Sequence, residues 1–218
     1  NEPHISLGTL PLKKSGFMVD PLNGRAVPKS AGSLNWRNSN SHWNYQSGEP
    51  VVVEVCSNLA TVELLLNGQS LGYRSMSECP DHIFRWVVPF AAGALTARAG
   101  FDGQEVTTRL ETVSAPVAFT LNADRRELAA DSYDVAHLVV QLVDSAGRPV
   151  KTEERKVTFR VEGDARMLGV DNGWSRNTQP FQADSIVTAQ GRCLLIVQAN
   201  QTPGTVRITA AIDGLEPH

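Results

Sequence analysis

Hydrophobic and polar residues alternate with a period of two along most of the chain beyond residue 50. The runs VTFRV at 157–161 and VRITAAI at 206–212 show the pattern clearly. Successive side chains of a strand point to opposite faces of a sheet, so this period predicts half-buried strands. No window of eleven residues has a helical period, and only Lys29 to Trp36 could form a helical turn or two.

Turn-forming pairs separate these runs. Asn67-Gly68, Asn172-Gly173 and Asp213-Gly214 lie beside strand-like segments and supply the positive φ angles of tight turns. We predict strands at residues 51–57, 61–67, 69–74, 82–88, 94–101, 105–113, 117–122, 136–143, 156–162, 166–170, 184–189, 192–199 and 204–212. Short strands with frequent turns favour antiparallel sandwiches.

The chain divides at a proline-marked joint, Ser114-Ala115-Pro116. The fold class we predict is all-β, with two tandem antiparallel β-sandwiches at 36–114 and 117–218. Residues 1–35 hold four of the twelve prolines and show no long alternation, so we predict an extended N-terminal arm. Such an arm is ordered only if it packs on something.

Several motifs, in order, resemble the domains that follow the catalytic barrel in β-galactosidases of glycoside hydrolase family 2. HWNYQSGEPVVVEVCSNLATVELLLNGQSLG (42–72) and FRWVVPFAAGALTARAGFDGQEVTTRLETVSAP (84–116) are similar to the immunoglobulin-like domain after the barrel. FTLNADRRELAADSYDVAHLVVQLVDSAGRPV (119–150), MLGVDNGW (167–174) and GRCLLIVQA (191–199) resemble the bacterial immunoglobulin-like module that comes next. SGFMVDPLNGRAVPK (15–29) resembles more weakly the segment leaving the last barrel strand.

This resemblance implies a C-terminal accessory region of a retaining, β-galactosidase-like enzyme. The family carries its two catalytic glutamates on a (β/α)8 barrel of about 250 residues, which this chain has no room for. We therefore expect the catalytic barrel as a partner, no turnover by this chain alone, and a periplasmic or extracellular location. The alternative is a stand-alone carbohydrate-binding or adhesive surface module.

Composition and charge exclude several other classes. The net charge of −3 over 218 residues lacks the basic excess that nucleic-acid binding needs. No apolar run approaches the roughly 18 residues of a membrane span, and the first residues do not form a signal peptide. We expect no cofactor and no metal, since His, Cys and Asp do not cluster. Cys56 and Cys193 are expected to be buried, with a Cys56–Cys79 disulfide as a minor alternative.

Aromatic residues carry the candidate binding chemistry, because sugars pack on flat aromatic faces beside planar polar groups. Two groups fit this description. The candidate carbohydrate-contact residues are Trp36, Trp43 and Tyr45 in one segment, and Asn172, Trp174 and Arg176 in another. Packing between domains is the favoured alternative for the first group. Trp174 departs from the family, which usually has an acidic or small polar residue there.

The acidic residues suggest ordinary surface roles. Retaining hydrolysis needs two carboxyl groups about 5 Å apart, one with a raised pKa. The nearest groupings, Glu153-Glu154 and Glu78 with Asp81, are expected to be solvated. The set Asp124, Asp131 and Asp134 could hold calcium, but turn formation is favoured.

Overall fold

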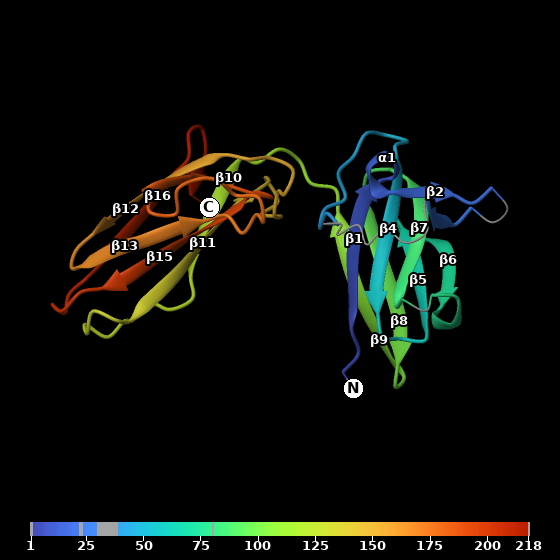
Figure 1. Ribbon diagram of the computed structural model, residues 1–218, viewed down its shortest axis with the longest axis horizontal. Coiled ribbons are helices and arrows are strands. Elements are labelled where there is room, and N and C mark those ends of the chain that lie inside the picture. Colours follow the sequence, from blue (N-terminus) through green and yellow to red (C-terminus); the bar gives the residue numbers. More distant parts are fainter. Residues whose placement is uncertain (1, 22–23, 30–38, 80, 218) are drawn as a thin grey trace. The chain divides into compact units, whose positions relative to one another are not determined.

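The computed structural model describes residues 2–21, 24–29, 39–79 and 81–217. The chain forms two compact units, residues 1–112 (unit 1) and 113–218 (unit 2), each with its own core. The boundary between them lies next to the proline-marked joint. Figure 1 shows the strands of each unit.

Unit 1 is a sandwich of two antiparallel sheets. In spatial order, the first sheet has β1 (Ile5–Pro11), β4 (Pro50–Ser57) and β7 (Ile83–Pro89), and the second has β6 (Gln69–Ser75), β5 (Thr61–Leu66), β8 (Ala94–Phe101) and β9 (Gln104–Glu111). Val51, Val53 and Val55 of the first sheet pack against Leu64 and Leu95 of the second, all buried.

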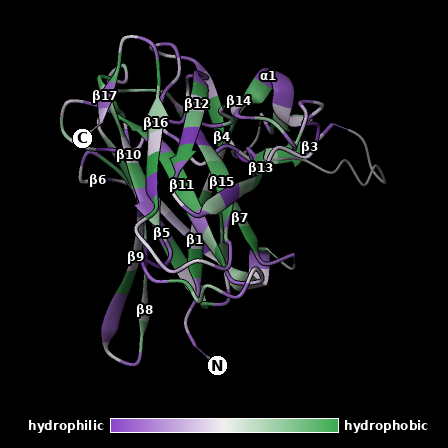
Figure 2. Ribbon diagram, turned by 90° about the vertical axis from the view of Figure 1, so that its left-hand side faces the viewer, coloured by the Kyte–Doolittle hydropathy of each residue, from purple (hydrophilic) through white to green (hydrophobic). Residues whose placement is uncertain are grey.

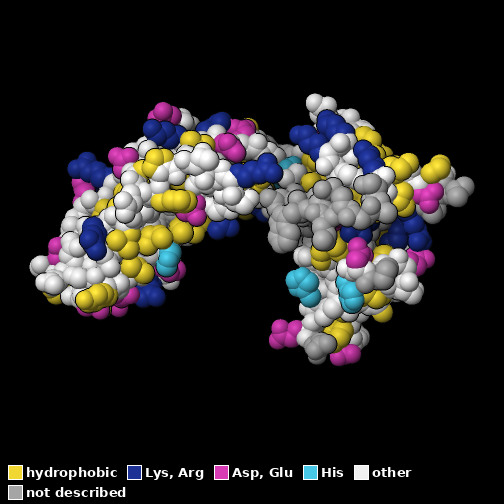
Figure 3. Space-filling model, viewed as in Figure 1, with side chains coloured by type: hydrophobic (Ala, Val, Ile, Leu, Met, Phe, Trp, Pro, Cys, Tyr) yellow, Lys and Arg dark blue, Asp and Glu magenta, His cyan; other side chains and the backbone are white. Residues whose placement is uncertain are grey.

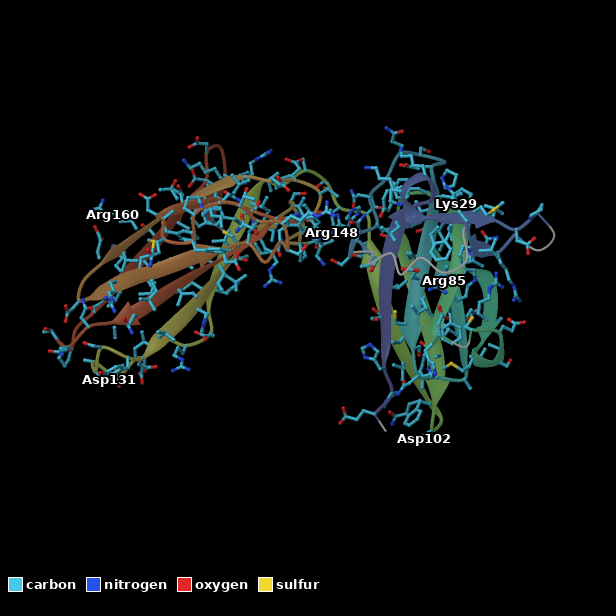
Figure 4. The ribbon with its side chains drawn as sticks, in the orientation of Figure 1. Lys29, Arg85, Asp102, Asp131, Arg148 and Arg160 are labelled. Carbon is cyan, nitrogen blue, oxygen red and sulfur yellow. The ribbon has the colours of Figure 1, made fainter. Side chains whose placement is uncertain are left out.

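Smaller elements cover the outer face of the three-stranded sheet. The single-turn helix α1 (Leu12–Ser15) ends at Gly16, and the hairpin of β2 (Phe17–Val19) and β3 (Ala26–Pro28) follows. The Phe17 ring is buried, with the Arg85 guanidinium 5.0 Å from its centroid. Arg85 also forms ion pairs with Glu54 and Asp81 (Figure 4). A short 3-10 helix, η1 (Met76–Glu78), follows β6.

Unit 2 is a second sandwich. In spatial order, one sheet has β13 (Ala165–Asp171), β15 (Arg192–Ala199), β11 (Val135–Val143), β10 (Ala118–Ala123) and β17 (Glu216–Pro217), and the other has β14 (Ser185–Val187), β12 (Lys156–Glu162) and β16 (Arg207–Ala211). All pairings are antiparallel except that of β10 with β17. Leu138, Val140 and Leu195 pack against Val157 and Phe159 in the core.

The all-β, two-sandwich prediction is confirmed, and every strand predicted from residue 51 onward has a counterpart. Figure 2 shows hydrophilic and hydrophobic residues alternating along several strands. The pattern missed α1, β2, β3, β17 and, most importantly, β1. The helical turn proposed for Lys29 to Trp36 falls almost wholly outside the described residues.

The predicted arm contains β1, which pairs with β4 from Ile5↔Ser57 to Pro11↔Val51. Thr9 is fully buried, and its hydroxyl donates to the carbonyl oxygen of His42 at 2.7 Å. The strand is therefore an integral edge of the sheet in unit 1.

Candidate carbohydrate-contact site

Trp174 lies in the connection between β13 and β14, in a loop organised by two side chains. The Asp171 carboxylate accepts hydrogen bonds from the backbone N–H of Asn172 and Gly173 and from the Asn177 amide. The Asn172 side-chain oxygen accepts the backbone N–H of Trp174 at 3.0 Å. These bonds fix the loop while the indole stays 41% exposed.

The two other residues predicted for this loop differ: Asn172 has a structural role, and Arg176 is exposed. The Asn172 side-chain amide donates to the Val187 carbonyl oxygen at 3.0 Å, which ties the loop to β14. Arg176 is exposed, and within the described residues its guanidinium has no ion-pair partner. One short segment thus carries an exposed aromatic ring and an exposed guanidinium. A sugar can pack on such a ring and form hydrogen bonds with such a group.

The second predicted group is built into unit 1. Trp43 is fully buried, its indole N–H donates to the Ala91 carbonyl oxygen at 3.0 Å, and its ring packs edge-on against Phe90. The Tyr45 hydroxyl contacts the Thr9 hydroxyl at 2.7 Å, and burial raises the pKa of Tyr45. This geometry favours packing for both. Trp36 lies outside the described residues.

Glu78, Asp81 and Glu153, three of the acidic residues considered for catalysis, have ion-pair partners. Glu78 pairs with Arg25, and hydrogen bonding from Arg25 lowers the pKa of Glu78. Glu153 pairs with Arg155. Each carboxyl group in the described part of the chain whose pKa is shifted is shifted downward, opposite to what a general acid needs.

The aspartates considered for calcium form turns. The Asp131 carboxylate accepts the backbone N–H groups of Tyr133 and Asp134, Asp134 pairs with Arg125, and Asp124 bonds to His137. No group of three potential metal-ligating residues occurs within the described ranges.

The cysteines correct one expectation. All three are free thiols, so the minor alternative of a Cys56–Cys79 disulfide does not hold. Cys56 is exposed rather than buried, because it shares the outward side of β4 with Glu54. Cys193 is buried as expected, and burial raises its pKa to about 12.

One surface was missed from sequence. On the four-stranded sheet of unit 1, the outward residues Glu63, Tyr73 and Arg98 lie on three neighbouring strands. Tyr73 is 61% exposed. The sequence feature that could have indicated this surface is Tyr73, an aromatic residue at an outward strand position.

Comparison with known proteins places this geometry in a family context. Residues 119–218 match the family model described as glycoside hydrolase family 2 C-terminal domain 5, and residues 48–107 match one for a domain of unknown function. No helix in the part of the chain that the structure describes is long and apolar enough to cross a membrane.

Similar proteins include two glycosidases and a solved glycosyl hydrolase of family 2. A β-galactosidase of Bacteroides ovatus is 30% identical over 80% of this chain and 21% of its own length, and a β-glucuronidase of Formosa agariphila is 31% identical over 63% and 14%. A solved family 2 glycosyl hydrolase from Bacteroides cellulosilyticus is 32% identical, with a TM-score of 0.82 over 98% of this chain and 27% of that one. The chain therefore spans about a quarter or less of these relatives.

Proposed function

We propose that this chain, which corresponds to the C-terminal region of family 2 glycoside hydrolases, is a non-catalytic support for the enzyme's catalytic barrel. The observation that carries the proposal is the match of both sandwiches to the same short stretch of much longer enzymes. In the parent, a retaining mechanism on a β-galactoside would use two barrel glutamates. The chain's own part is to stabilise that barrel.

The outer face of the five-stranded sheet in unit 2 supports this role. Val139 pairs with Leu194, and His137 pairs with Ile196, on the side opposite the buried Leu138 and Leu195. Figure 3 shows hydrophobic side chains gathered over β13, β15 and β11. A sheet that carries apolar residues on both of its faces is usually covered by another layer on each face. We assign the catalytic barrel of the same enzyme as that layer.

Charge substitutions on this face test the assignment in the parent enzyme. Replacing both Leu194 and Ile196 with Glu should lower the melting temperature of the barrel, because two carboxylates would be buried without partners. Thr209→Glu, on an exposed position of β16, is the matched control. In the isolated 218-residue chain, the double substitution and Thr209→Glu should give the same melting temperature. Equal melting of all the enzyme variants would refute the support role of this face.

Sequencing the gene around this chain tests the proposal independently. A barrel of the family encoded in the same reading frame is the expected result. A frame that joins the chain to adhesive modules instead would favour the alternative of a surface protein. Fractionation of the source cells would test the periplasmic or extracellular location.

A second candidate function is sugar contact by the loop around Trp174. The specific observation is a tryptophan that the loop's hydrogen bonds hold partly exposed, two residues before the exposed Arg176. A titration with oligosaccharides should change tryptophan fluorescence, and Trp174→Ala should remove the change. The same response in the Trp174→Ala variant would refute contact at this loop.

A further inference from the structure

The outer face of the four-stranded sheet in unit 1 carries a row of polar side chains across three strands. Glu63 on β5 is opposite Tyr73 on β6 and opposite Arg98 on β8. Their neighbours along the strands, Val62 and Ala97 among them, point into the core. The row therefore faces away from the sandwich interior.

Glu63 anchors this row. Only 4% of it is exposed, and its carboxylate accepts hydrogen bonds from Ser70, Arg98 and Tyr73. These bonds, that from Ser70 foremost, lower the pKa of Glu63 despite its burial. A buried carboxylate is retained only with such partners. In consequence, the Arg98 guanidinium is held in place at the surface, with Glu105 3.6 Å from its Nη1.

A hollow of about 780 Å³ lies beside the row. It is lined by Thr61, Tyr73, Arg98, Gly100, Gln104 and Glu105, among others. Gly100 contributes to the hollow because it has no side chain, and nothing lies within 4 Å of where its Cβ would be. Asp102, in the turn after β8, also lines it (Figure 4). The volume is in the range of small-ligand sites.

The lining chemistry matches carbohydrate. An exposed aromatic ring can pack on the C–H face of a pyranose, and planar groups such as those of Arg98 and Gln104 can bond to hydroxyls. The formal charge is negative, since Glu63, Asp102 and Glu105 outnumber Arg98. A uronic acid would meet repulsion at this surface.

We propose that this hollow is a binding site for neutral oligosaccharides, with Tyr73 as the stacking residue. Arg98, Gln104 and Glu105 bond to the hydroxyl groups. The residues that line this hollow belong to unit 1, whereas the loop around Trp174 belongs to unit 2. It does not depend on the support role proposed above, because it needs only unit 1 to be folded.

Calorimetric titration of the 218-residue chain tests the site with three probes: β-1,4-galactotetraose, cellotetraose and tetragalacturonate. We expect saturable binding of at least one neutral probe below about 10 mM. Binding of tetragalacturonate should be at least about tenfold weaker. Amide shifts in the nuclear magnetic resonance spectrum should localise to β5, β6 and β8.

Two variants test two different features of the site, the aromatic ring and the open space beside it. Tyr73→Ala removes the stacking ring and should weaken binding about tenfold. Gly100→Val fills the hollow on a strand that accepts β-branched residues, and should weaken binding at least as much. Tyr133→Ala removes an 83% exposed tyrosine of unit 2 and should bind as the unchanged chain does.

Several outcomes would overturn the proposal. One is the absence of saturable binding of both neutral probes by the folded chain. Another is unchanged binding in both the Tyr73→Ala and Gly100→Val variants. A third is loss of binding in Trp174→Ala alone, which would move the sugar site to the loop in unit 2.

Discussion

Asp144 is the polar residue that organises the loop after β11. It is fully buried, and its carboxylate receives the Arg148 guanidinium at 2.7 Å and the backbone N–H groups of Ser114, Ala146 and Arg148. Desolvation alone would raise the pKa of Asp144, but these hydrogen bonds outweigh it and lower the pKa to about 2. One side chain thus ties the joint between the units to the turn that follows β11.

The lowered pKa makes a prediction about stability and pH. The pKa of Asp144 is lower when folded than the unfolded value of about 3.9, so its contribution is complete above pH 4 and is lost as the pH falls through about 2. Asp144→Asn should lower the unfolding free energy at pH 7 by on the order of 2 kcal/mol. Urea titrations monitored by circular dichroism at pH 7, 4 and 2 measure this.

The matched control is Asp213→Asn, at an exposed position in the turn that follows β16. It should change the unfolding free energy by less than about 0.5 kcal/mol. A destabilisation by Asp144→Asn that stays the same from pH 7 to pH 2 would contradict the ionised, hydrogen-bonded role of Asp144.

Side-chain periodicity also decided which residue predictions succeeded. Val51, Val53 and Val55 of β4 point into the core, so Cys56 must face outward with Glu54. The period of the strand contains that information, although the usual burial of cysteine points the other way. The burial of Trp43 could not be predicted from strand periodicity, because it depends on packing against Phe90, which lies far away in sequence.

At the scale of elements, the turn before β15 depends on a glycine. Gly191 has φ +69°, and a Cβ there would lie 1.8 Å from the Val150 carbonyl oxygen, a backbone atom. The Gly191 carbonyl oxygen accepts the Leu142 N–H at 2.8 Å, which joins the turn to the end of β11. Both the conformation and the close approach require a residue without a side chain.

Gly191→Ala should therefore destabilise unit 2 by about 3 kcal/mol or more. Gly214→Ala separates the two causes, since Gly214 has φ +75° but nothing within 4 Å of the added Cβ. This control should cost only about 1 kcal/mol. Thermal denaturation of the two variants provides the comparison, and equal losses would refute the steric argument.

Element prediction was accurate where one face of a strand meets the core and the other meets water. β1 does not have one buried and one solvent-exposed face, because the consecutive residues Gly8, Thr9 and Leu10 are all buried. Its sequence, ISLGTLP, contains glycine and proline and lacks the alternation of an ordinary half-buried strand. Only its pairing with β4, at least forty residues away in sequence, defines it as a strand.

The binding surfaces were harder to predict for the same reason. Tyr73, Glu63 and Arg98 are adjacent only through strand pairing, and the hollow beside them depends on the missing side chain of Gly100. The Trp174 loop was recognisable because its aromatic, amide and guanidinium groups are close in sequence. Local motifs can be found in a sequence, whereas surfaces that span three strands require the register.

At the scale of the whole molecule, the two cores are separate. The core cluster around Trp43 lies entirely in unit 1, and the cluster around Val140 lies entirely in unit 2. Two cores that share no residue should unfold as two transitions. The chain is thus expected to behave as two stability units joined by residues 112–113.

Trp43→Ala tests that independence. It removes a fully buried ring and its hydrogen bond, so unit 1 should lose about 3–5 kcal/mol. The amides of unit 2 should keep their hydrogen-exchange protection. Trp174→Ala, at a partly exposed position, should leave both units within about 0.5 kcal/mol. Parallel loss of protection in both units would contradict independent folding.

We propose that this chain supports a glycosidase without performing hydrolysis itself. The most direct measurement is the rate at which the purified, folded 218-residue chain releases chromophore from a chromogenic β-galactoside, compared with the enzyme that includes the barrel. We predict a rate equal to the buffer background for the chain and turnover for the enzyme. Hydrolysis by the chain above background, retained through successive purification steps, would contradict the account.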